Sequence, residues 1–216
     1  GPNITRQRSP HVHCTLFSHD NRFLFVPDLG IDKIMIYKFD EVKGTLVPSK
    51  QPFAKSSAGA GPRHFCFHPM GKYAYLMEEL SGTVVSFNYK NGKLKPIQRI
   101  SSMPVTDTGF AGSADIHVSP DGKFLYASNR ANSNTIAIFK INQNNGRLES
   151  AGHQSTLGKT PRNFNFDPSG KFLLVANQNS DEIVVFRIDK TTGLLTDTGQ
   201  RIEVGNPVCI KWIAGQ

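Results

Sequence analysis

The feature that most constrains this chain is a repeat with a period of about 50 residues. In four places a turn-forming residue stands two positions before an aromatic residue, and a glycine followed two residues later by leucine comes after each of them. The turn residues are Asn21, Gly71, Gly122 and Gly170, and the later glycines are Gly44, Gly92, Gly146 and Gly193. Self-similarity at such a fixed period is typical of propellers and other repeat architectures. The fold must therefore be built from four similar units.

One unit contains the pattern of four short strands. In the second unit the strand-like ranges are 63–68, 72–80, 83–89 and 94–100, and the last two flank Asn91-Gly92, a strong hairpin signal. Four up-and-down strands in about 50 residues form the blade of a β-propeller. No segment shows sustained helical spacing of apolar residues. We predict an all-β partial propeller over 1–216, with four-stranded antiparallel blades at about 10–56, 57–108, 109–156 and 157–204.

A further strand-like segment follows the fourth unit. Residues 206–213 resemble the first strand of a blade, but no turn or second strand follows them. The first unit already has its own first strand at 11–17, so this extra strand has no vacancy to fill within the chain. We infer a C-terminal fragment of a larger ring. An open arc would expose apolar blade faces, so we expect it to pair with the missing N-terminal blades or to associate with itself.

Composition narrows the partners. The 25 Lys and Arg exceed the 17 Asp and Glu, giving a net charge of +8 that suits anionic ligands. No basic cluster with interleaved aromatic residues predicts nucleic-acid binding, and no apolar run approaches the ~18 residues of a membrane helix. Cys14, Cys66 and Cys209 each lie in an apolar run. We expect reduced core thiols, which favour a cytoplasmic location.

Departures from the repeat gather charged residues at one place. Positions equally far before and after the first turn lie at the same end of a hairpin, so we expect them at one mouth of the central channel. Eight residues before the turn the units carry His13, Arg63, Ala114 and Arg162, and eight residues after it they carry Leu29, Glu79, Arg130 and Gln178. Arginines that converge on one space repel one another unless an anion lies among them, and each guanidinium can hold a phosphate or carboxylate by two hydrogen bonds. The pattern predicts an anion-binding mouth.

Other polar positions have simpler interpretations. Seven residues after the turn every unit carries a short polar or acidic side chain (Asp28, Glu78, Asn129 and Asn177), which we expect to satisfy backbone groups at the strand end. A metal could be imagined at His11, His13 and His64, but the sequence fixes no complete ligand set. We therefore expect neither a metal nor a cofactor. Glu79 and His13 are the candidates for moving a proton.

These residues occur in motifs that resemble a known family. The motifs are Pro10-His11-Val12-His13, Val26-Pro27-Asp28-Leu29-Gly30, Pro62-Arg63-His64, Glu79-Leu80, Ser128-Asn129-Arg130 and Asn177-Gln178-Asn179-Ser180-Asp181. The chain is similar to the lactonase family of seven-bladed propellers, which contains bacterial 6-phosphogluconolactonases and is related to the fungal carboxymuconate lactonizing enzyme. The resemblance implies seven blades in the complete ring, of which roughly three are absent from this sequence.

The resemblance also implies a site and a reaction. It implies catalytic roles for His13, Arg63, Glu79 and Arg130, and substrate-binding roles for the neighbouring His11, Arg162 and Gln178. Both histidines of the Pro-His-x-His motif fit, and the repeat favours His13 because it shares a position with Arg63. The implied reaction is hydrolysis of a sugar lactone, 6-phosphogluconolactone above all, by water that Glu79 or His13 activates beside an arginine clamp. A non-catalytic propeller that binds ligands or proteins and a carboxymuconate-type cycloisomerase remain as alternatives.

Overall fold

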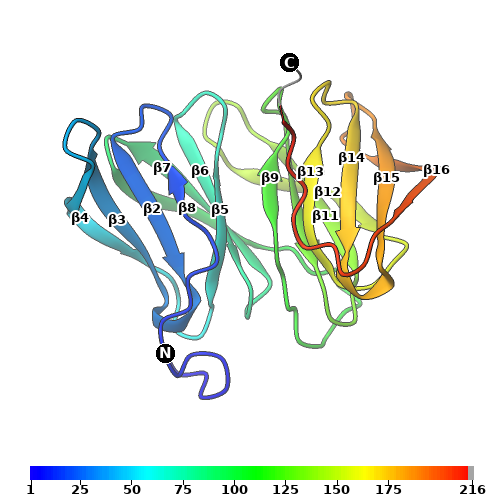
Figure 1. Cartoon of the computed structure of the whole chain (residues 1–216), viewed down its shortest axis with the longest axis horizontal. Coiled ribbons are helices and arrows are strands. Elements are labelled where there is room, and N and C mark those ends of the chain that lie inside the picture. Colours follow the sequence, from blue (N-terminus) through cyan, green and yellow to red (C-terminus); the bar gives the residue numbers. More distant parts are fainter. Residues whose placement is uncertain (214–216) are drawn as a thin grey trace.

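The computed structural model describes residues 1–213, which form four four-stranded antiparallel sheets arranged side by side in chain order (Figure 1). The strands of each sheet also follow chain order, as expected for propeller blades. The prediction of an all-β chain with four-stranded antiparallel blades is confirmed. Within residues 1–213 no helix is long and apolar enough to cross a membrane.

The strand bounds show how regular the blades are. The first blade holds β1 (Leu16–Phe17), β2 (Phe23–Asp28), β3 (Lys33–Asp40) and β4 (Thr45–Lys55). The second holds β5 (Pro62–Phe67), β6 (Tyr73–Glu78), β7 (Thr83–Lys90) and β8 (Lys93–Ser101). The third holds β9 (Ile116–Val118), β10 (Phe124–Asn129), β11 (Thr135–Ile141) and β12 (Leu148–Ser155). The fourth holds β13 (Pro161–Phe166), β14 (Phe172–Asn177), β15 (Glu182–Ile188) and β16 (Leu195–Glu203), and two short 3-10 turns follow β2 and β14 (η1, Leu29–Ile31; η2, Gln178–Ser180).

The hydrophobic core lies between blades rather than inside them. Phe25 and Ile36 of the first blade pack with Phe65 and Leu76 of the second in one cluster of buried side chains. A second cluster joins the second and third blades, and a third cluster joins the third and fourth blades. A single sheet has two apolar faces and no interior of its own, so each blade depends on its neighbours for burial.

The second glycine of the repeat has a packing reason as well as a conformational one. Gly146 has a φ of +69°, and a Cβ atom built on it would lie 2.4 Å from the ring of Tyr73 in the preceding blade. Gly92 and Gly193 meet the rings of Phe23 and Phe124 in the same way. Gly44 shares the positive φ but has no atom within 4 Å of the added Cβ. In the second, third and fourth blades, this glycine therefore leaves space for an aromatic ring of the blade before it.

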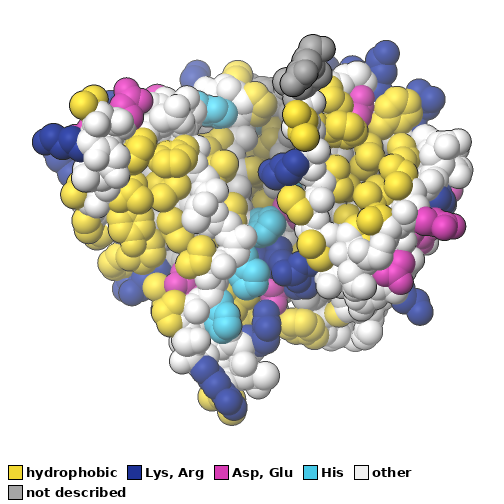
Figure 2. Space-filling view, viewed as in Figure 1, with side chains coloured by type: hydrophobic (Ala, Val, Ile, Leu, Met, Phe, Trp, Pro, Cys, Tyr) yellow, Lys and Arg dark blue, Asp and Glu magenta, His cyan; other side chains and the backbone are white. Residues whose placement is uncertain are grey.

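The first and last blades each leave one face partly open. The β6 and β10 strands are buried at every position, whereas Leu24 and Val26 of β2 and Ile183 and Val185 of β15 are only half-buried. Figure 2 shows hydrophobic side chains gathered over these two outer blades. These faces are the counterparts of the surfaces that form the inter-blade clusters elsewhere.

Two expectations about the chain's details are corrected. Residues 206–213 form no strand; they run beside β13 (Figure 1), where the Ile210 amide donates to Asn163 Oδ1 at 2.7 Å and Trp212 Nε1 donates to the Phe166 carbonyl. The first strand of a blade pairs with the second strand of the same blade, and within residues 1–213 no second strand follows 206–213. The cysteines are free thiols, but none is fully buried in a core: Cys66 is half-buried and packs against the cluster between the second and third blades, Cys14 is half-buried, and Cys209 is exposed.

Candidate functional site

The charged residues of the mouth are placed by β-bulges at one repeated position. In the second blade the pairing of β5 with β6 shifts by one residue between Pro62 and His64, and Arg63 is the extra residue. In the fourth blade the same shift lies between Pro161 and Asn163, so the extra residue is Arg162. A bulge re-aims the side chain of its extra residue and is common beside active sites. The repeat position that the sequence singled out is therefore a place where the backbone turns a side chain out of the regular alternation.

The first blade carries a similar irregularity beside His13. Val12 pairs with Asp28, whereas Leu16 pairs with Phe25, so three residues on one strand oppose two on the other. His13 is the first of these three residues. This break explains why β1 is only two residues long, although a strand over 11–17 was expected.

Glu79 is the centre of a cluster of three arginines. Its Oε2 accepts from Arg63 Nε at 2.8 Å and lies 3.1 Å from Arg130 Nη2, while its Oε1 accepts from Arg6 Nη2 at 2.5 Å. Arg63 also donates through Nη1 to the Ala114 carbonyl at 2.8 Å, and Arg130 donates through Nε to the Gly112 carbonyl at 2.6 Å. We call Arg6, Arg63, Glu79 and Arg130 the mouth cluster. Its three guanidinium groups share one carboxylate, which leaves an excess of positive charge.

Burial of the mouth cluster shifts the pKa values of its charged groups. Glu79 and Arg63 are each 2% exposed. Burial alone would raise the pKa of Glu79, but Arg130, Arg63 and Arg6 outweigh it and hold the pKa below its usual value. Burial, reinforced by Arg130, lowers the pKa of Arg63 to about 10. At neutral pH the carboxylate is therefore ionised and occupied by arginines, which suits an organiser of cations better than an acceptor of protons.

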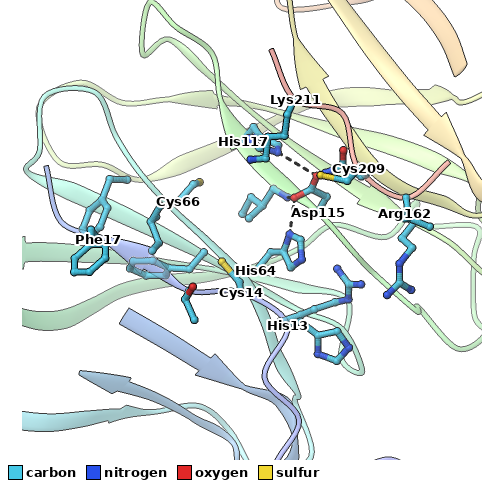
Figure 3. A pocket seen from close by; sticks show the side chains of 18 of the residues that line it. His13, Cys14, Phe17, His64, Cys66, Asp115, His117, Arg162, Cys209 and Lys211 are labelled. Carbon is cyan, nitrogen blue, oxygen red and sulfur yellow. Dashed lines mark hydrogen bonds and ion pairs between the residues drawn. The ribbon is translucent and has the colours of Figure 1, made fainter. Parts of the chain in front are cut away.

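A cavity of about 690 Å³ lies along the first strands of the four blades. We call it the channel cavity; His13, Arg63, His64, Asp115 and Arg162 are among its lining residues. Figure 3 shows His13 and Arg162 at one end of it and Phe17 and Cys66 at the other. The three cysteines also line this cavity, which explains why they are not packed in a blade core.

His13 has the properties of a neutral base. Burial, followed by the charge of Arg63, lowers the pKa of His13 to about 4, so its imidazole is uncharged at neutral pH. Its Nδ1 is buried and has no hydrogen-bond partner within residues 1–213. A buried polar atom without a partner is rare in native proteins and calls for a functional explanation. His13 lines the channel cavity, where its uncharged imidazole lies near Arg63.

Arg162 is the cation of the site that no acid neutralises. It lines the channel cavity beside Asn163, and its positive charge lowers the pKa values of Arg63 and Arg130. Within the described chain its side chain makes no ion pair, whereas Arg63 and Arg130 both pair with Glu79. Arg162 is therefore free to bind an anion.

An acidic hub, Asp115, ties the first strands of three blades together. Its Oδ1 lies 2.6 Å from His64 Nδ1, its Oδ2 lies 3.1 Å from His117 Nε2, and Asn163 donates to the same Oδ2 at 2.5 Å. Burial would raise the pKa of Asp115, but His117 and His64 hold it far below its usual range. Sequence reasoning missed this hub because Asp115 lies outside the three repeat positions that were compared.

Two predicted substrate-binding residues lie apart from this group. The side chain of His11 is exposed, and its backbone amide donates to Asp28 Oδ1 at 2.8 Å. Gln178 begins η2 and is half-buried, and its backbone amide donates to the Thr160 carbonyl. Neither residue lines the channel cavity. The structure thus brings Arg63, Glu79 and Arg130 together, places His13 and Arg162 beside them, and leaves His11 and Gln178 outside.

The residues one position earlier in the repeat are largely structural, as expected. Asp28 accepts from the backbone amides of His11 and Gly30, and Asn177 donates to the Thr156 carbonyl. Asn129 donates to the Ser102 carbonyl and accepts from two serine hydroxyls. Glu78 differs, because it pairs with the Arg99 side chain rather than with backbone. Among residues 1–213, no group of three or more His, Cys, Asp or Glu side chains is placed to hold a metal ion.

Comparison with known proteins places this geometry in a family. The family model described as "Lactonase, 7-bladed beta-propeller" matches residues 1–212. A 6-phosphogluconolactonase of Formosa agariphila is 46% identical over 92% of this chain and 56% of its own length. A 6-phosphogluconolactonase of Bacillus subtilis is 40% identical over 99% of this chain and 60% of its own length.

A solved structure agrees with these relatives. The periplasmic gluconolactonase of Pseudomonas aeruginosa superposes with a TM-score of 0.91 at 38% identity, over 96% of this chain and 58% of that one. The chain thus spans less than two thirds of the length of the relatives that it matches. The match nevertheless covers nearly all of the sequence, including every blade. The chain belongs to the lactonase family of seven-bladed β-propellers.

Proposed function

We propose that the intact protein hydrolyses a sugar lactone, with 6-phosphogluconolactone as the substrate, at the end of the channel cavity between His13 and Arg162. The observation that carries the proposal is a neutral imidazole that lines the channel cavity beside guanidinium groups whose charge exceeds that of their one carboxylate. A lactone becomes an oxyanion when water attacks it, and the product is a carboxylate. The names of the two curated relatives agree with this chemistry.

The reaction needs a base, an oxyanion donor and a proton for the leaving oxygen. Water adds to the lactone carbonyl carbon as its proton passes to the His13 imidazole, and the carbonyl oxygen takes on negative charge. Arg162 and the free edge of Arg63 stabilise this oxyanion, an effect worth about 3–4 kcal/mol for one preorganised donor. The ring carbon–oxygen bond then breaks, and the imidazolium returns its proton to the ring oxygen. The open-chain acid leaves with His13 neutral again.

The sequence left both Glu79 and His13 as candidates for the base. The contacts of Glu79 favour a different role for it. Its carboxylate accepts from three arginines, and its lowered pKa opposes protonation. We therefore propose that Glu79 orients Arg63 and Arg130, and that His13 alone moves the proton. His11 and Gln178, which lie outside the channel cavity, have no part in this proposal.

The test is a steady-state assay with the intact protein and paired variants. Arg162→Gln removes the unpaired cation, and Lys171→Gln removes an exposed cation of the same blade. We expect Arg162→Gln to lower kcat/KM for 6-phosphogluconolactone at least tenfold, as loss of a charge-assisted hydrogen bond does, and Lys171→Gln to leave it unchanged. Equal activity of both variants would contradict the proposed site, and a wild-type protein without lactonase activity would leave a ligand-binding propeller as the better description.

We also propose that the open faces of the two outer blades are covered by other surfaces. Leu24 and Val26 on one side and Ile183 and Val185 on the other are half-buried where inner blades bury their counterparts. We expect the 216-residue chain alone to self-associate through these faces, with a concentration-dependent mass in sedimentation equilibrium. A monomer at all concentrations would contradict this.

The three free thiols support a reducing compartment such as the cytoplasm, although one relative is named for the periplasm.

A further inference from the structure

A segment before the first blade, residues 1–10, is fixed to the mouth by buried contacts. Gln7 is 4% exposed, and its Nε2 donates to the Leu29 carbonyl and to Asp32 Oδ1, both at 2.8 Å. Asp32 in turn accepts from the backbone amides of Gly59 and Gly61 in the loop that leads into the second blade. The segment is thus tied to the boundary between the first two blades.

A glycine lets the segment cross close to this boundary. A Cβ atom built on Gly30 would lie 1.9 Å from the Ser9 carbonyl oxygen, an approach that no side chain permits. Its backbone amide donates to Asp28 Oδ1 at 2.9 Å, which fixes the turn from the other side. The segment therefore follows one path across the mouth.

This path delivers Arg6 to Glu79 and to a second cavity. The mouth cavity, of about 340 Å³, is lined by Arg6, Glu79, Phe110, Gly112, Arg130, Ala131 and Thr160. It is distinct from the channel cavity, whose lining includes Arg63 but neither Arg6 nor Arg130. The ion pair of Arg63 with Glu79 connects the two cavities.

The arginines of the mouth cavity carry more positive charge than their one carboxylate neutralises, so an anion can bind there. Arg6 donates to Glu79 through Nη2, and its side chain is 42% exposed where it lines the cavity. Arg130 directs Nε and Nη2 to Gly112, Ser113 and Glu79. Glu79 is shared with Arg63, so it cannot neutralise all three guanidinium groups. Two arginines that line one cavity with residual charge match a phosphate group, which accepts several hydrogen bonds.

We propose that Arg6 and Arg130 form the subsite for the phosphate of the substrate, separate from the lactone end that His13 and Arg162 serve. This inference rests on the proposed function for its substrate. The segment 1–10 acts as the support that positions Arg6, with Gln7 as its anchor. Arg6 is a specificity residue that distinguishes a phosphorylated lactone from an unphosphorylated one.

The experiment compares two lactones in the intact protein. Arg6→Gln removes the proposed contact, and Arg8→Gln is its control, because Arg8 is an exposed arginine of the same segment whose side chain, among residues 1–213, bonds only to the Ile4 carbonyl. We expect Arg6→Gln to raise KM for 6-phosphogluconolactone at least tenfold and to leave kcat/KM for gluconolactone within twofold. Arg8→Gln should change neither. An equal loss on both lactones, or no loss on either, would overturn the inference.

A direct binding measurement separates this inference from the proposed function. Inorganic phosphate titrated into the protein by calorimetry probes the subsite without any catalysis. We expect binding by the wild type and by Arg8→Gln, and binding weakened at least tenfold by Arg6→Gln and by Gln7→Ala. Unchanged phosphate binding in Arg6→Gln would overturn the subsite even if lactone hydrolysis is confirmed. Phosphate binding that depends on Arg6 would support it even if neither lactone is hydrolysed.

Discussion

Glu79 Oε2 accepts a hydrogen bond from Arg63 Nε at 2.8 Å, and both side chains are buried. Arg63 lines the channel cavity and Glu79 lines the mouth cavity. The pair therefore holds two binding spaces at a fixed separation. Under the proposed function, the pair lies between the lactone end of the channel cavity and the phosphate subsite of the mouth cavity.

Replacing Glu79 tests whether it organises arginines or accepts protons. Glu79→Gln leaves three guanidinium groups without their carboxylate, so we expect a loss of about 3–5 kcal/mol of unfolding free energy, typical of breaking a buried ion pair. We expect kcat to fall at least tenfold while the residual activity keeps its acidic limb, moved to lower pH because the Glu79 carboxylate raises the pKa of His13. Urea unfolding and pH–rate curves measure both effects, with the exposed Glu41→Gln as control. A residual activity that lost its pH dependence would identify Glu79 as the base instead.

The pKa of His13 predicts the shape of the pH profile. Burial and Arg63 lower this pKa to about 4, so the neutral, proton-accepting form is present above that pH and is lost below it. We expect kcat/KM to be flat from pH 5 to 8 and to fall as the pH drops through about 4. An acidic limb near 6.5, the usual pKa of histidine, would contradict this account.

The two histidines of the Pro-His-x-His motif provide a matched pair of variants. His13→Gln removes the base and should lower kcat about 10²–10⁴-fold. His11→Gln alters an exposed side chain outside both cavities and should leave kcat within twofold. Steady-state rates on 6-phosphogluconolactone distinguish the two. The reverse order of effects would assign the role to His11.

Gly146 leaves room for an aromatic ring and no ring lies beside Gly44, so we predict that alanine destabilises the protein more at position 146 than at position 44. Gly146→Ala and Gly44→Ala both place alanine at positive φ, which costs about 1–2 kcal/mol. Only Gly146→Ala also drives a Cβ into the ring of Tyr73, and overpacking of this kind adds about 1–3 kcal/mol. We expect the larger drop in thermal midpoint for Gly146→Ala. Equal drops would show that the ring moves aside without cost.

Asp115 is expected to matter for stability through the three blades that it joins. Asp115→Asn removes the charge that faces His64 and His117 and weakens the contact with Asn163. We expect a loss of about 1.5–3 kcal/mol in urea unfolding, because hydrogen bonds to a buried carboxylate are weakened or lost. Glu149→Gln, at an exposed position, controls for the change in net charge. A loss no larger than that of the control would show that the hub is dispensable.

The fold was predictable because the spacing of the repeated turn residues and glycines gives the positions of the four strands in each blade. The turns at Gly71 and Gly122 and the glycines at Gly92 and Gly146 fix where strands begin and end, and packing between blades follows from that alternation. The comparison of repeat positions also found Arg63, Glu79 and Arg130, because hairpin geometry brings equal offsets to one end. Residues 206–213 show the limit of the method, since a strand-like pattern forms no strand without a partner.

The rest of the site could not be reached by comparing repeats. Arg6 precedes the first unit and has no counterpart in the other units, so only the path of segment 1–10 reveals its contact with Glu79. The pairing of Glu79 with arginines, on which its proposed role rests, depends on side-chain positions across two blades. The isolation of Gln178 likewise depends on the turn η2, which leads the chain away from the channel cavity.

The most direct test of the central claim is the time course of 6-phosphogluconolactone opening, followed by NMR with purified intact protein and with its His13→Gln, Arg162→Gln double variant. The account predicts that catalytic amounts of the wild type open the lactone far faster than buffer, and that the double variant, while folded, follows the buffer rate. A wild-type rate equal to that of buffer, or a folded double variant as fast as the wild type, would contradict it.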